Sequence, residues 1–191
     1  MQKKLNVFLS NFAEQRMSFY DYGEDDMYRI GYFAYRWSYI NKNSDVKIEN
    51  KGNETYYTVS YDVIKKLADK YLGRDIKKED LKGFESRDKY QGFFENGNYY
   101  IPAADGESFA SIAVATSVED TGHDIYRVEF AVFDMDMDAY WDNDEVIPKQ
   151  FYGYTFKEAS DSKDLIQTDN GYAIVKKDGD SYKLRFYELY R

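Results

Sequence analysis

Three two-residue turn signals constrain the fold of this chain more than any other feature. They are Asn96-Gly97, Asn170-Gly171 and Asp178-Gly179, and residues that favour strands flank each of them. Asn-Gly and Asp-Gly are preferred at the centre of two-residue β-hairpin turns, because both positions need a positive φ. A turn of this length joins antiparallel strands only. The second half of the chain is therefore predicted to form an antiparallel sheet.

Runs of apolar and aromatic residues predict the other strands. The run at 109–116 is small or apolar almost throughout, which is typical of a strand covered on both faces. It is predicted to pair with 125–133 across a turn at 119–124. Further strands are predicted at 46–49, 55–59, 93–94, 99–101 and about 182–190.

Two segments in the first half of the chain have the spacing of amphipathic helices. The segment 25–41 repeats apolar residues at intervals of three and four positions: Met27, Ile30, Ala34 and Trp37. The segment 61–72 has a similar apolar face, and Ser60 and Gly73 suit its N-terminal and C-terminal caps. The segment 5–20 contains phenylalanines without a clean period, so we expect a short strand or turn there.

Two early helices followed by a late sheet predict an α+β fold, in which the helices pack on a largely antiparallel, curved β-sheet. By analogy, a curved sheet wrapped on a helix occurs in cystatin-like and nuclear-transport-factor-like folds. A chain of 191 residues can bury one sizeable core. Because neither a composition shift nor an internal repeat divides the sequence, we expect a single domain over residues 1–191.

Charge and composition exclude several kinds of partner and chemistry. The net charge is −9 and the isoelectric point is about 4.7, so nucleic acid and anionic membrane surfaces are disfavoured as partners. No apolar run reaches about 18 residues, so direct membrane insertion is not expected. The absence of cysteine excludes disulfides, thiolate metal sites and cysteine nucleophiles. The single histidine, His123, lies in a predicted turn, where a solvated side chain is more common than a catalyst.

Aromatic residues make up 19% of the chain, with 21 Tyr and 13 Phe. Tyrosine suits half-buried strand positions, because its ring packs while its hydroxyl stays in water. The surplus therefore has two interpretations. One is a β-rich fold with thin layers, and the other is a surface that stacks on sugars or peptides.

One acidic stretch has the spacing of a calcium-binding loop. Acids occupy positions 1, 3, 5, 9 and 12 of that pattern, and position 7 supplies a backbone carbonyl. Calcium prefers six to eight oxygen ligands, which clustered carboxylates provide. The predicted metal ligands are Asp134, Asp136, Asp138, Tyr140, Asp142 and Glu145.

A solvated acidic loop is the alternative interpretation of this stretch. Ala139 stands where an EF-hand has glycine and the flanks are not helical, so any calcium site here would be of another type. The preceding strand alternates with its even-numbered residues apolar, and continued alternation would bury Asp134. We therefore expect the strand either to end near Phe133 or to contain a bulge.

Three short stretches resemble a known family: 9–14 (LSNFAE), 100–109 (YIPAADGESF) and 186–190 (FYELY). Together they are similar to extracytoplasmic domains of unknown function from low-GC Gram-positive bacteria, which are often lipid-anchored or membrane-tethered. The resemblance extends over most of the chain and brings no established catalytic residues with it. It implies a location at the cell surface or in the secreted fraction, with the cytoplasm as the alternative.

The sequence contains no Gly-rich phosphate loop and no nucleophile-elbow motif, so we predict no catalytic or cofactor-binding residues. The first functional hypothesis is a non-catalytic extracytoplasmic binding or interaction domain, with an unknown protein or carbohydrate as ligand. The second hypothesis is a carboxylate-based hydrolase that acts in an aromatic cleft. A deep pocket with two facing acids would favour the hydrolase, whereas a shallow aromatic face would favour the binding domain.

Overall fold

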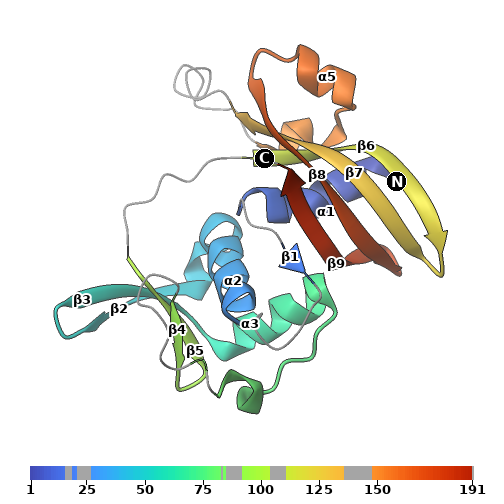
Figure 1. Ribbon diagram of the computed structural model, residues 1–191. Coiled ribbons are helices and arrows are strands. Elements are labelled where there is room, and N and C mark those ends of the chain that lie inside the picture. Colours follow the sequence, from blue (N-terminus) through green and yellow to red (C-terminus); the bar gives the residue numbers. More distant parts are fainter. Residues whose placement is uncertain are drawn as a thin grey trace. The chain divides into compact units, whose positions relative to one another are not determined.

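The computed structural model describes residues 1–15, 19–20, 27–82, 84, 92–103, 111–135 and 148–190. The protein has the predicted α+β fold, with antiparallel sheets and helices (Figure 1). The chain forms two compact units. The first unit consists of Met1–Asp21 and Ser108–Arg191, and the second consists of Tyr22–Glu107. The expectation of a single domain over residues 1–191 stays a prediction.

The first unit is built on a five-stranded antiparallel sheet with the strand order β1-β9-β8-β7-β6. We refer to it as the large sheet. Its elements are α1 (Gln2–Ala13), β1 (Phe19–Tyr20), β6 (Ser111–Gly122), β7 (Ile125–Met135), η5 (Pro148–Gly153), α5 (Phe156–Asp161), β8 (Leu165–Asp178) and β9 (Ser181–Tyr190).

Helix α1 packs on one face of the large sheet and lies along β6 (Figure 1). The ring of Phe8 lies 5.8 Å from that of Tyr182, and the ring of Phe12 lies 5.8 Å from that of Tyr187. Phe130 of β7 stacks on Tyr187 at 4.9 Å, so aromatic contacts fill the layer between helix and sheet. We call the opposite face of the sheet the outer face.

A short strand or turn was predicted for residues 5–20. Helix α1 occupies this segment up to Ala13, so the prediction was wrong there, and the short strand β1 follows at Phe19–Tyr20. Leu5, Phe8, Leu9 and Phe12 are buried and follow helical spacing. The helix also covers the edge strand β6 with side-chain acceptors. The Ala113 N–H donates to Ser10 Oγ at 2.9 Å, and the Ala115 N–H donates to Asn6 Oδ1 at 2.9 Å. These bonds satisfy backbone groups that an uncovered edge would leave to solvent.

The predicted turn at Asn170-Gly171 is also wrong, because both residues lie inside β8. Gly171 is required there by packing rather than by turn geometry. A Cβ atom at this position would lie 2.7 Å from Cζ of Phe130 and would also clash with the Glu188 carbonyl oxygen. The hairpin predicted at Asp178-Gly179 is confirmed with its turn shifted by one residue. Asp178 pairs with Ser181, so the turn residues are Gly179, with a φ of 58°, and Asp180.

The second unit contains a four-stranded antiparallel sheet with the order β2-β3-β5-β4, which we call the small sheet. Its elements are α2 (Met27–Asn41), η2 (Asn43–Asp45), β2 (Val46–Lys51), β3 (Glu54–Val59), α3 (Tyr61–Leu67) with its π-helical continuation (Ala68–Leu72), η4 (Lys78–Leu81), β4 (Phe93–Glu95) and β5 (Asn98–Pro102). Both predicted helices, the strands predicted at 46–49 and 55–59 and the hairpin at Asn96-Gly97 are confirmed within the described residues. Gly73 adopts the left-handed cap at a φ of 64°.

Helix α2 packs on the small sheet through aromatic rings. Tyr35 stacks on Tyr57 at 5.7 Å, and Tyr28 lies 6.4 Å from Phe94. Ile64, Leu67 and Tyr71 of the second predicted helix are buried, which confirms its apolar face. Tyr71 packs on α2, with its ring 5.6 Å from that of Phe33.

Candidate functional site

The outer face of the large sheet carries a cluster of aromatic and charged side chains. Strand β7 contributes Arg127 and Glu129, β8 contributes Tyr172, and β9 contributes Phe186 and Tyr190. We call these five residues the aromatic patch. Strand register brings them together, because Glu129 pairs with Tyr172 and Tyr172 pairs with Glu188. Phe186 and Tyr190 are therefore the two diagonal neighbours of Tyr172 on the same face.

The three rings of the patch stack on one another. The ring centroids of Tyr172 and Phe186 lie 4.8 Å apart with an interplanar angle of 29°. Those of Tyr172 and Tyr190 lie 5.8 Å apart with an angle of 26°. Stacked rings on neighbouring strands hold one another in place, so the patch is ordered before any ligand arrives.

Arg127 and Glu129 extend the patch with fixed charges. The Arg127 guanidinium carbon lies 4.3 Å from the Tyr172 ring centroid, a cation–π contact. Its Nη2 and Nε atoms donate to Glu129 Oε1 at 2.7 Å and 3.0 Å. The bond to Glu129 raises the pKa of Arg127, so the guanidinium keeps its charge. Burial, and then the nearby Glu129 carboxylate, raise the pKa of Tyr190, so its phenol stays neutral and can donate.

The patch is open to solvent, whereas the other end of the outer face is covered. Tyr190 is 46% exposed, and Tyr172 and Phe186 are half-buried. Further along β7, the outer-face residues Ala131, Phe133 and Met135 belong to a buried cluster with Phe151 and Ala159 of the 148–161 segment. The 148–161 segment thus covers one half of the outer face, and the aromatic patch on the other half stays a shallow exposed surface.

Of the predicted calcium ligands, Asp134 is the one within the described residues, and Asp136, Asp138, Tyr140, Asp142 and Glu145 lie outside them. Asp134 is half-buried near the end of β7, and its Oδ1 accepts a hydrogen bond from Ser111 Oγ at 2.6 Å. Strand β7 continues to Met135, and its register against β8 shifts between Val132 and Phe133. Both of these residues are buried, because α1 and the 148–161 segment cover opposite faces here. The calcium site stays a prediction.

The structure describes no metal cluster elsewhere. Within the described ranges, no three His, Asp or Glu side chains lie close enough together to hold a metal ion. His123 is exposed and lies in the β6–β7 turn with a φ of 56°.

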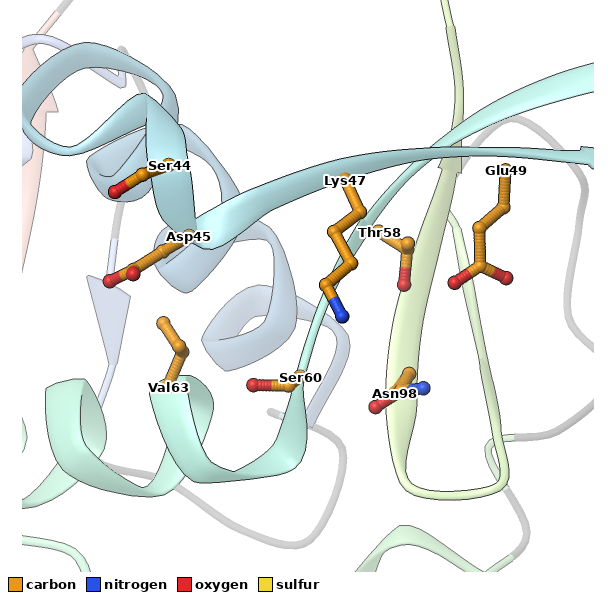
Figure 2. Close-up of a pocket in the computed structure, with 8 residues that line it drawn as sticks. All are labelled: Ser44, Asp45, Lys47, Glu49, Thr58, Ser60, Val63 and Asn98. Atoms are coloured by element: carbon orange, nitrogen blue, oxygen red, sulfur yellow. The ribbon is translucent and has the colours of Figure 1, made fainter.

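The second unit has a polar hollow of about 190 Å³ beside β2 (Figure 2). Figure 2 shows Lys47, Thr58 and Glu49 pointing the same way from β2 and β3, with Asn98 opposite them. The Thr58 hydroxyl is buried beside that of Tyr100. Burial raises the pKa of Tyr100, whose hydroxyl donates to Glu49 at 3.0 Å.

The two acids of this hollow do not form a facing pair. Asp45 Oδ1 forms an ion pair with Lys42 Nζ at 2.7 Å, and the Glu49 carboxylate accepts a hydrogen bond from the Tyr100 hydroxyl. In Figure 2, Lys47 lies between the two carboxylates. A general acid and base must both reach one scissile bond, so this arrangement gives the hydrolase hypothesis little support.

Comparisons with known proteins identify no relative: no protein-family model, no curated protein and no solved structure matches the chain. Among the helices that the structure describes, none is both long enough and apolar enough to cross a membrane.

Proposed function

We propose that this protein is a non-catalytic binding domain that holds a carbohydrate on the aromatic patch. The observation that carries the proposal is the stack of Tyr172, Phe186 and Tyr190 on an open sheet face. Sugar rings present flat C–H surfaces that pack on aromatic rings. The neighbouring Arg127 and Glu129 supply a donor and an acceptor for hydroxyl groups.

Charge narrows the class of carbohydrate. The chain has a net charge of −9, so its field repels polyanions such as acidic polysaccharides and nucleic acids. Arg127 is already bonded to Glu129, which leaves the pair neutral as a unit. A neutral polysaccharide is therefore the preferred ligand.

Binding to polysaccharide particles tests this function. We expect the wild type to be depleted from solution by at least one of cellulose, chitin and starch. Tyr172→Ala and Tyr190→Ala should each weaken that binding about tenfold, because one stacking contact is lost. Tyr172→Phe keeps the ring and should bind nearly as well as the wild type.

Tyr39→Ala is the matched control, because it removes a half-exposed tyrosine from the second unit. It should leave carbohydrate binding unchanged. Thermal melts must show that each variant is folded. Failure of the wild type to bind any particle, or retained binding by both alanine variants, would contradict the carbohydrate proposal.

A protein partner is the second candidate, and the composition of the patch favours it. Tyrosine and arginine are enriched among residues that contribute most to protein interfaces. A partner for this patch would present a flat apolar surface with polar groups at its rim. Loss of a purified partner's binding in Tyr190→Ala, together with no binding to particles, would select this candidate.

The location and the calcium site complete the proposal. The resemblance to extracytoplasmic Gram-positive domains supports a place at the cell surface, where polysaccharide is abundant. We also propose calcium as a ligand of residues 134–145, on the spacing of their acids.

A further inference from the structure

Strand β2 is an edge of the small sheet, and its outward backbone groups can be identified from the hydrogen-bond pattern. The Ala103 N–H donates to the Thr55 carbonyl at 2.8 Å, so odd-numbered residues of β3 bond toward β5. Even-numbered residues of β3 then bond toward β2, where their partners are Lys47, Glu49 and Lys51. The N–H and C=O groups of Val46, Ile48 and Asn50 therefore point away from the sheet.

The side chains of this edge are exposed and of mixed charge. Ile48 is 68% exposed, more than any other large apolar side chain in the described strands. The Lys47 side chain is exposed, and its ammonium makes no ion pair or hydrogen bond with the described part of the chain. Glu49 is half-buried. Its side chain lies on the same face of the small sheet as that of Lys47 (Figure 2).

We propose that β2 pairs antiparallel with β2 of a second copy of this chain, joining two small sheets into one continuous sheet. With Ile48 opposite Ile48 of the second copy, Lys47 falls opposite Glu49 and Glu49 opposite Lys47. The outward groups of Val46 and Asn50 then face each other as well. A two-fold axis between the strands repeats every contact, so the edge is complementary to itself.

Two other edges within the described residues, β4 and β6, lack this complementarity. On β4, the Phe94 N–H already donates to the Phe84 carbonyl at 3.0 Å. On β6, α1 covers Ala113 and Ala115, while the end beyond it carries Glu119 and Asp120. A second copy on that end would meet like charges, which is a common protection against edge pairing. Strand β2 instead carries opposite charges on either side of an exposed isoleucine.

Sedimentation equilibrium of the full chain tests the dimer, at concentrations from about 10 µM to 1 mM. The wild type should dimerise. Lys47→Glu alone and Glu49→Lys alone should each dimerise at least about tenfold more weakly, since both cross-strand pairs become repulsive. An equimolar mixture of the two variants should recover dimers, because each chain then faces only opposite charges in the proposed register.

Two further variants separate this dimer from a general charge effect. Lys66→Glu makes the same charge change on the exposed side of α3 and should leave dimerisation unchanged. Ile48→Pro removes an outward N–H that β3 does not use, so it should abolish the dimer while the melting temperature stays close to that of wild type. A wild type that is monomeric throughout, or a mixture that gains nothing over the single variants, would overturn the proposal.

Discussion

Asn6 shows how much a single buried side chain contributes to the first unit. Its amide nitrogen donates to the carbonyls of Tyr152 and Tyr154 at 3.1 Å each, while its oxygen accepts from the Ala115 N–H. The side chain has no exposed surface. It thereby connects α1, the edge strand β6 and the 148–161 segment. Burying an amide is favourable only when its bonds are made, so this residue fixes where α1 lies on β6.

Replacing Asn6 with leucine should therefore destabilise the protein severely. Leucine keeps the approximate volume but leaves one N–H and two carbonyls buried without these bonds, which should cost about 3–5 kcal/mol. Urea unfolding followed by circular dichroism measures the loss. Asn11→Leu makes the same change on α1, where the amide donates to the Val7 carbonyl of the helix itself, and should cost less than about 1 kcal/mol. Equal losses for both variants would contradict the connecting role.

At the scale of elements, local signals predicted those parts of the fold that local chemistry determines. The Asn96-Gly97 pair was sufficient to predict a hairpin, Gly73 to predict the end of a helix, and the alternation of 125–133 to predict a strand. Helix α1 was missed because residues 5–20 were treated as one segment. Phe8 and Phe12 have helical spacing, but Phe19 belongs to β1, beyond the end of the helix. The turn prediction at Asn170-Gly171 was wrong because Gly171 is there to make room for the Phe130 ring on the neighbouring strand. That contact exists only in the folded sheet and has no local signal in the sequence.

The aromatic patch could not be predicted for a related reason. Simple alternation along β9 would place Phe186 on the same face as Tyr182, which packs under α1. The register against β8 instead shifts between Ile174 and Val175, so that Arg185 is an extra residue. The shift turns Phe186 to the outer face and Tyr187 to the buried one. One inserted residue thus creates the surface on which the proposed function rests.

The acidic stretch 134–145, which begins in the last two residues of β7, carries the calcium prediction. Calcium should raise the melting temperature by linking the carboxylates of 134–145, with weak affinity of about 10⁻⁴–10⁻³ M because Ala139 replaces the loop glycine. Calorimetry and thermal melts in millimolar calcium measure this, and Asp136→Asn should reduce both signals. Asp62→Asn, on the exposed side of α3, is the control. If the wild type shows neither heat nor a shift, the stretch is a solvated acidic loop.

At the scale of the whole molecule, buried tyrosines link stability to alkaline pH. Burial raises the pKa of Tyr35 to about 12, and it also raises the pKa of Tyr99 and that of Tyr187. In the unfolded chain each phenol titrates near its ordinary value of about 10. Above that pH the folded state retains more protons than the unfolded state, so stability falls as pH rises.

We therefore expect the free energy of unfolding to be nearly constant up to about pH 9 and to fall steadily between about pH 10 and 12. Urea midpoints measured across this range give the slope. Tyr35→Phe removes one titrating group and should make the decline shallower, whatever it does to stability at neutral pH. A slope identical to that of wild type would show that Tyr35 titrates normally in the folded protein.

The division of the first unit along the chain has a consequence for how the protein is made. Met1–Asp21 emerges from the ribosome before the whole second unit, yet β6, the strand that α1 covers, comes only after Ser108. Translation proceeds at about 5–20 residues per second, so roughly 5–20 s pass between the synthesis of the amphipathic α1 and that of β6. During that interval the second unit can fold as a self-contained insert, while Phe8 and Phe12 have nothing of their own unit to pack against. Nascent chains of this protein should accordingly bind a chaperone through the apolar face of α1 until β6 has been synthesised.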